Sequence, residues 1–86
     1  MDRMPTELDL LLAAELDHAR DMLVMMGDEL ASDFAVISRH GLCLQAVDIV
    51  GQMLGHIAAV VRAADQGEAV EAIGMCELKA KLAKAA

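Results

Sequence analysis

Aromatic side chains are nearly absent from this chain of 86 residues, which has one Phe and neither Trp nor Tyr. Seven methionines take over the role of bulky apolar residues, and flexible thioether side chains either fill gaps in a core or line adaptable binding surfaces. There is one proline, and no segment has the alternating pattern of a strand or the self-similarity of a repeat. The sequence therefore predicts an all-α fold.

Basic residues are also scarce. The chain has 7 Lys and Arg against 14 Asp and Glu, for a formal net charge of −7. The basic cluster Lys79, Lys81 and Lys84 falls late in a predicted helix, where cations complement the helix dipole. Because nucleic-acid phosphates are bound by clustered Lys and Arg, we expect no nucleic-acid partner.

Two cysteines are present, and they lie far apart. Cys43 and Cys76 match no metal-binding or redox spacing. Cysteines of this kind are typically small buried apolar residues. The sequence therefore predicts neither a metal nor a cofactor.

A long hydrophobic run is missing as well. The longest apolar stretch without a charge, 49–61, is too short to span a bilayer and contains Gln52 and His56. Residues 1–5 lack the basic and apolar regions of a signal peptide. We therefore expect a cytoplasmic protein that has no membrane partner.

Aliphatic residues are what the chain has in excess. Hydrophobic residues make up 57% of it, compared with about 45–50% in typical soluble proteins. A chain of this length forms a single domain, 1–86, and a domain of about 60 residues buries only about 60% of its unfolded surface. The surplus of apolar side chains predicts a homodimer.

Helical periodicity places three helices at about 7–26, 33–64 and 68–83, which predicts a three-helix up-down-up bundle whose helical hairpins pair into a four-helix core in the dimer. Thr6 is the predicted N-cap of the first helix and Gly27 its C-cap. Asp17 and Arg20 are expected on the face opposite the core. The apolar stripe expected to face the core comprises Leu8, Leu12, Leu16, Ala19, Leu23 and Met26.

The second helix combines a small-residue edge with a polar stripe. Gly51, Gly55 and Ala58 share an edge, where another backbone can come close or a ligand can dock. The polar stripe has spacings of three, four and four residues and comprises Gln45, Asp48, Gln52 and His56. An amide donates and accepts hydrogen bonds at once, so Gln52 is suited to orient a water molecule beside the Asp48 carboxylate. A solvated helix face is the alternative interpretation.

The segment 48–52, with the sequence Asp-Ile-Val-Gly-Gln followed by Met-Leu, resembles the Asp-x-x-x-Gln signature of the CheZ chemotaxis phosphatases. The resemblance implies a long antiparallel hairpin that dimerises into a four-helix bundle. It also implies that Gln52 orients water on the phospho-aspartate of a response regulator, while Asp48 contacts a lysine of that regulator. The match covers five to seven residues, and the chain is shorter than members of that family.

Two other histidine patterns are present. His40 and Leu42 resemble the His-x-Leu-Lys-Gly motif of histidine phosphotransfer domains, although Cys43 and Leu44 stand at the Lys and Gly positions. Glu15 and His18 have the Glu-x-x-His spacing of di-iron bundles, which need two such motifs and further Glu residues. A surface histidine and a structural carboxylate are the alternative interpretations.

The sequence therefore leaves two classes of function open. One is a protein-interaction module that binds itself and another protein through surfaces rich in Met, Gly and Ala. The other is a CheZ-like phosphatase that acts on a response regulator through Gln52 and Asp48.

Overall fold

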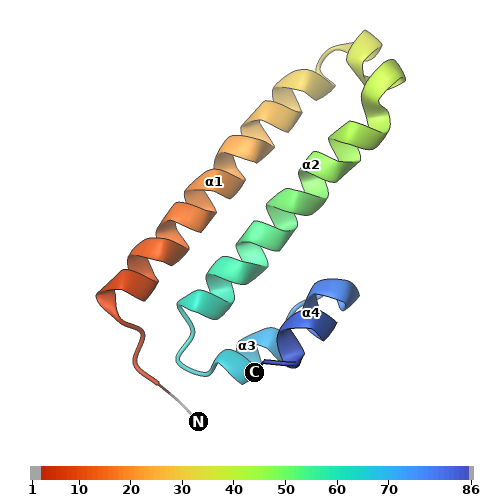
Figure 1. Ribbon diagram of the computed structural model, residues 1–86. Helices are drawn as coiled ribbons and strands as arrows, with labels where there is room; N and C mark the ends of the chain where they lie inside the picture. The colour runs from red at the N-terminus through yellow and green to blue at the C-terminus, as the bar shows by residue number, and fades with distance from the viewer. Residues whose placement is uncertain (1–2, 86) are drawn as a thin grey trace.

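Two long antiparallel helices form most of the molecule (Figure 1). The computed structural model describes residues 3–85, and within that range the chain forms four helices and no strand. Helix α1 (Glu7–Ala31) and helix α2 (Phe34–Val61) form a hairpin, with Ser32 and Asp33 between them. The predicted all-α fold is confirmed.

Helix α1 begins where the sequence indicates but ends later. Thr6 Oγ1 accepts a hydrogen bond from the Asp9 backbone N–H at 3.0 Å, and Asp9 Oδ2 accepts one from the Thr6 N–H at 3.0 Å, which completes a capping box. The predicted end at residue 26 is wrong, because α1 continues through Gly27 without a positive φ. A Cβ at Gly27 would lie 3.4 Å from Val47 Cγ1. This glycine therefore lets the two helices come close and does not terminate α1.

Helix α2 is capped by Asp33, whose carboxylate accepts a hydrogen bond from the Ala35 N–H at 2.9 Å. The Ser32 hydroxyl instead donates to the Glu29 carbonyl at 2.7 Å and so belongs to the end of α1. Helix α2 ends at Val61, three residues before the predicted end. It is kinked at His40, where φ is −129° and ψ is 26°.

The predicted third helix, 68–83, is wrong, because this part of the chain forms two short helices. Helix α3 (Gln66–Glu71) and helix α4 (Cys76–Ala83) are separated by a break that contains Gly74, and glycine costs a helix about 1 kcal/mol relative to alanine. The break folds α4 back, so that three buried apolar residues, Val70, Ile73 and Leu78, form one cluster. That cluster packs against the α2 residues Met53, Ile57 and Val60.

Helices α3 and α4 lie beside α2 on the side away from α1 (Figure 1). They therefore replace the third long helix of the expected up-down-up bundle and pack against the C-terminal half of α2. The molecule measures 50 × 26 × 14 Å, and its shortest dimension is little more than the diameter of one helix, about 10–12 Å. Stable domains are ordinarily built from at least two packed layers, whereas this hairpin is a single layer.

Candidate functional site

Small side chains line the seam between α1 and α2. Ala13 in α1 and Ala58 in α2 are 1% and 0% exposed, and Gly51 is also buried. A Cβ at Gly51 would lie 3.8 Å from Arg20 Cγ and 3.9 Å from Val24 Cγ2. The small-residue edge predicted on the second helix is therefore where the α1 backbone comes close.

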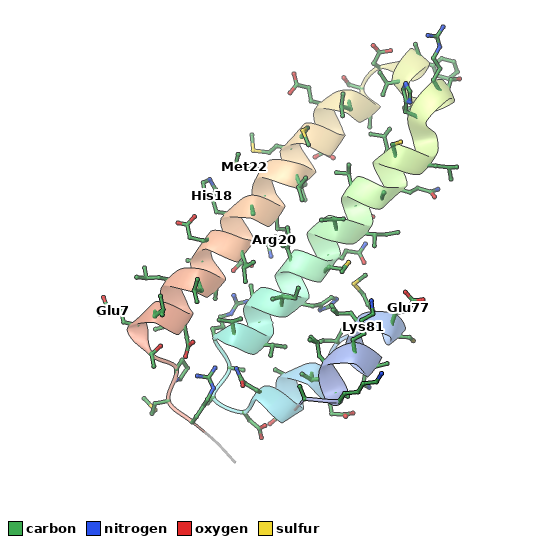
Figure 2. The ribbon with its side chains drawn as sticks, in the orientation of Figure 1. Glu7, His18, Arg20, Met22, Glu77 and Lys81 are labelled. Atoms are coloured by element: carbon green, nitrogen blue, oxygen red, sulfur yellow. The ribbon has the colours of Figure 1, made fainter. Side chains whose placement is uncertain are left out.

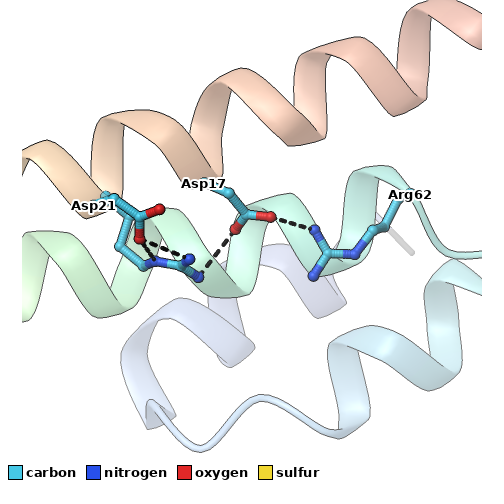
Figure 3. A network of polar contacts seen from close by, with 4 residues as sticks. Asp17, Asp21 and Arg62 are labelled. Carbon is cyan, nitrogen blue, oxygen red and sulfur yellow. Dashed lines mark hydrogen bonds and ion pairs between the residues drawn. The ribbon is translucent and has the colours of Figure 1, made fainter.

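Charged residues lie along the same seam. Asp17 accepts a hydrogen bond from Arg20 Nη1 at 3.0 Å and another from Arg62 Nη1 at 2.8 Å, while Arg20 Nη2 contacts Asp21 at 3.0 Å (Figure 3). The prediction that Asp17 and Arg20 lie on the face opposite the core is wrong, because both lie at the seam with α2. The residues that sequence reasoning missed are Arg62 as a partner of Asp17 and Arg20 as a seam residue. Ala13, Asp17 and Arg20 are four and three residues apart in the sequence, and this helical spacing was the available signal that they share a face.

The two flanks of the hairpin differ in chemistry. The rotation between successive helical residues determines which residues lie on each flank. Successive residues in an α-helix are turned by about 100°. Since α1 and α2 are antiparallel, residues that directly precede a seam residue point to one flank of the hairpin on both helices, and residues that directly follow one point to the other. Leu12 and Val50 thus share a flank, as the residues before Ala13 and Gly51.

The first of these flanks is apolar, and we call it the apolar flank. Leu12 and Met26 are 48% and 49% exposed there, and Val50 is also exposed. The leucine stripe that was predicted to face the core therefore lies beside the seam on this flank, where Leu16 and Leu23 are half-buried and Leu12 and Met26 are exposed. The residues of the apolar flank are Leu12, Leu16, Ala19, Leu23, Met26 and Leu30 from α1, and Cys43, Ala46, Val50, Leu54 and Ile57 from α2. Of these, Ile57 packs against the cluster of α3 and α4.

The opposite flank, which we call the polar flank, carries Asp48 and Gln52. Both side chains are exposed, and Gln52 Nε2 donates a hydrogen bond to Asp48 Oδ2 at 3.1 Å. The predicted stripe is continued by the exposed Gln45 and the half-buried His56. Asp48 also lines a shallow hollow at the seam together with Asp28 of α1. The helix therefore brings the amide and the carboxylate together where another protein can reach them.

The other predicted pairs lie at the surface. His18 Nδ1 and Glu15 Oε2 are 3.9 Å apart, and their side chains are 68% and 81% exposed. Figure 2 shows His18 and Met22 pointing away from α2, whereas Arg20 lies between the two helices. Within residues 3–85, no group of three His, Cys, Asp or Glu side chains is placed to hold a metal ion. His40 is exposed at the kink of α2.

Both cysteines, which were predicted to be buried, are exposed. Cys43 lies on the apolar flank. Cys76 is the first residue of the short helix α4.

The N-terminal segment is anchored at the base of the hairpin. Arg3 Nη2 donates to the Val61 carbonyl at 2.8 Å, and the Arg3 backbone N–H donates to the Ala64 carbonyl at 2.7 Å. Arg3 Nη1 also contacts Asp9 Oδ2 at 2.6 Å. The backbone N–H of Thr6 and the Arg3 guanidinium hold the pKa of Asp9 below its ordinary value of 3.8.

By length and composition alone, α2 is apolar enough to cross a membrane, with a mean hydropathy of 1.5 over an 18-residue window. The apolar core helix of a soluble protein has the same properties. In α2, 11% of this 18-residue window is buried within the structure. Its exposed large apolar residues include Leu42, Ile49 and Val50, whereas Met53, Ile57 and Val60 pack against the cluster of α3 and α4.

Comparison with protein-family models, with curated proteins and with solved structures finds no match to this chain.

Proposed function

We propose that this chain is a small cytoplasmic protein-interaction module that binds a helical surface through its apolar flank. The observation that carries the proposal is the exposure of large aliphatic residues along one flank of a single-layer hairpin, with Leu12, Met26 and Val50 as examples. Contiguous apolar patches on soluble proteins mark interaction sites. An amphipathic helix pair of this kind binds other helices by laying its apolar face against theirs.

Site-specific photo-crosslinking in cells tests this proposal. A photoreactive amino acid replaces Met26 on the apolar flank or, as the matched control, the neighbouring Met25, which follows the seam residue Val24 and is 71% exposed off that flank. We expect a discrete covalent adduct from position 26 and little or none from position 25. Equal labelling at the two positions, or no adduct at either, would contradict the assignment of an interaction surface.

A second candidate function concerns the polar flank and belongs to two-component signalling. The observation that favours it is the hydrogen-bonded pair Asp48 and Gln52, exposed on the flank that a partner on the apolar flank leaves open. In this reaction Gln52 orients a water molecule, whose oxygen bonds to the phosphorus of a phospho-aspartate while the bond from phosphorus to the aspartyl oxygen breaks. The products are inorganic phosphate, the free carboxylate and a proton released to solvent.

Asp48 has a docking role in this second candidate. Its carboxylate pairs with a lysine of the regulator and fixes the position of Gln52 above the phosphoryl group. The regulator brings its own divalent ion, so the chain itself needs none. The resemblance to the CheZ motif supports these roles through the same two residues.

The phosphate lifetime of response regulators phosphorylated with acetyl phosphate tests the second candidate. We expect the wild-type chain to shorten that lifetime and Gln52→Ala to lose at least about 90% of the effect, since the loss of one positioned amide from an active site costs about 10²–10³-fold. Gln45→Ala is the matched control, because Gln45 is an exposed amide on the same stripe. An unchanged lifetime with the wild-type chain would leave only the interaction module.

A further inference from the structure

We infer that the partner on the apolar flank is a second copy of this chain, packed antiparallel so that α1 lies on α1 of the other copy and crosses it at Ala19. This inference rests on the proposed interaction function and names its partner. It is carried by three observations: the area left exposed, the thickness of the hairpin and the symmetry of the stripe on α1.

The chain exposes more surface than a monomer of its mass. It exposes 6223 Å², whereas the scaling of surface with mass gives about 4,900 Å² for a compact protein of 9.1 kDa. The excess is about 1,300 Å² per chain. If two copies bury this area against each other, the interface buries about 2,600 Å² in total, which lies within the range of obligate homodimer interfaces. The excess therefore matches what a stable dimer covers.

The thickness of the hairpin points to the same partner. The molecule is 14 Å thick, so it forms one layer, and a second layer of the same kind completes a domain with a core. Two hairpins stacked by their apolar flanks give a four-helix arrangement whose interior consists of leucine, methionine and valine.

The stripe on α1 is close to symmetric about Ala19. Ala19 is the middle residue of Glu7–Ala31. Leu12 and Met26 lie seven residues before and after it, and Leu16 and Leu23 lie three before and four after. A two-fold interface requires that residue i contacts j and that j contacts i. An antiparallel copy centred on Ala19 pairs Leu12 with Met26 in this way, and Leu16 and Leu23 come within one residue of the same symmetry.

Ala19 itself fits the centre of such a crossing. Its small side chain, together with Met22, Leu23 and Met26, lines a shallow apolar groove on α1. A groove with a small residue at the two-fold axis lets two helix backbones come close, and the larger side chains on either side then interlock. The leucine stripe, which its own chain covers only in part, thereby becomes the centre of the dimer.

The solution mass of the purified full chain tests whether the partner is a copy. We expect twice the chain mass of 9.1 kDa in sedimentation equilibrium for the wild type and for Met25→Glu. We expect the single-chain mass for Leu12→Glu, with its helical circular dichroism retained. A wild-type mass of one chain at every concentration would overturn this inference. The proposed interaction function would then still be decided separately, by whether photo-crosslinking from position 26 gives a covalent adduct.

Disulfide trapping tests the packing without a destabilising substitution. In a background with Cys43→Ser and Cys76→Ser, Ala19→Cys is expected to cross-link two chains under mild oxidation, because the two-fold axis brings this residue next to its own copy. Leu12→Cys is the matched control and is expected to stay reduced, since an antiparallel copy places position 12 beside position 26. Cross-linking by Leu12→Cys and not by Ala19→Cys would overturn the antiparallel packing.

Discussion

Arg62, the C-cap residue that follows α2, donates a hydrogen bond from Nη1 to Asp17 Oδ2 in the middle of α1, at 2.8 Å and 45 residues away in sequence. The other oxygen of the same carboxylate accepts from Arg20 Nη1 at 3.0 Å. Asp17 therefore joins the two helices across the seam.

Asp17→Asn is expected to lower the free energy of unfolding by about 1–2 kcal/mol, because hydrogen bonds to charged groups contribute about 1.5–3 kcal/mol when partly buried and less when solvated. Asp21→Asn is the control and is expected to change it by less than about 0.5 kcal/mol, since Asp21 contacts only its neighbour Arg20 among residues 3–85. Urea denaturation at one fixed protein concentration measures both. Equal effects would show that Asp17 does not join the helices.

The glycines of α2 provide a second prediction. Gly51→Ala is expected to raise the free energy of unfolding by about 0.5–1 kcal/mol, because alanine favours a helix and its Cβ would lie at ordinary contact distance, 3.8 Å, from Arg20 Cγ. Gly51→Leu is expected to lower it, since the larger side chain would push the helices apart.

Gly41 is the matched control for this glycine series. A Cβ there meets nothing within 4 Å, so alanine and leucine are expected to be tolerated alike. Thermal melting of the four variants separates helix propensity from packing. A tolerated Gly51→Leu would contradict the close approach of α1 and α2.

The capping box makes stability depend on pH at the acid end. The pKa of Asp9 is lowered in the folded chain, by the Thr6 N–H first and by Arg3 next. A carboxyl group with a lowered folded pKa contributes stability above its unfolded value of 3.8 and loses that contribution as the pH falls through the folded pKa. Asp9→Asn is therefore expected to reduce stability at neutral pH and to flatten its decline in acid. Parallel acid titrations of the two chains that keep a constant difference would contradict this.

The location of the chain in the cell follows from how α2 is covered. If the apolar flank is buried against protein, the chain is expected to stay in the soluble fraction after cell lysis, although α2 is long enough to cross a bilayer. Ultracentrifugation followed by an alkaline wash of the membrane pellet measures this. Retention of most of the chain in the washed pellet would identify α2 as a membrane segment and contradict the cytoplasmic proposal.

Local signals in the sequence predicted much of the fold. The capping residue Thr6, the helical periods of the two long helices and the small-residue edge at Gly51 each report on contacts within a few residues or on one helix face, and the structure agrees with all three. The pairing of Asp48 with Gln52 also follows from their spacing alone. These features depend little on the rest of the chain.

The orientation of α1 could not be predicted in the same way. An apolar stripe shows which face of a helix needs burial, but not whether its own chain or another molecule covers it. The Leu12 and Leu23 face was assigned to the core, whereas glycine and alanine let α2 pack beside it, against Ala13 and Arg20. The break at Gly74 was missed for a related reason, because it depends on packing against α2.

Association is expected to bury the apolar flank. The methyl groups of two neighbouring methionines report on this burial without any substitution. Met25 and Met26 are 71% and 49% exposed in the single chain, and only Met26 lies on the apolar flank. The measurement is the NMR relaxation of methyl-labelled methionine with a water-soluble paramagnetic agent, over a dilution series. We predict that Met26 is protected at high protein concentration and becomes accessible on dilution, while Met25 stays accessible throughout. Equal accessibility of the two methyl groups at every concentration would contradict the claim.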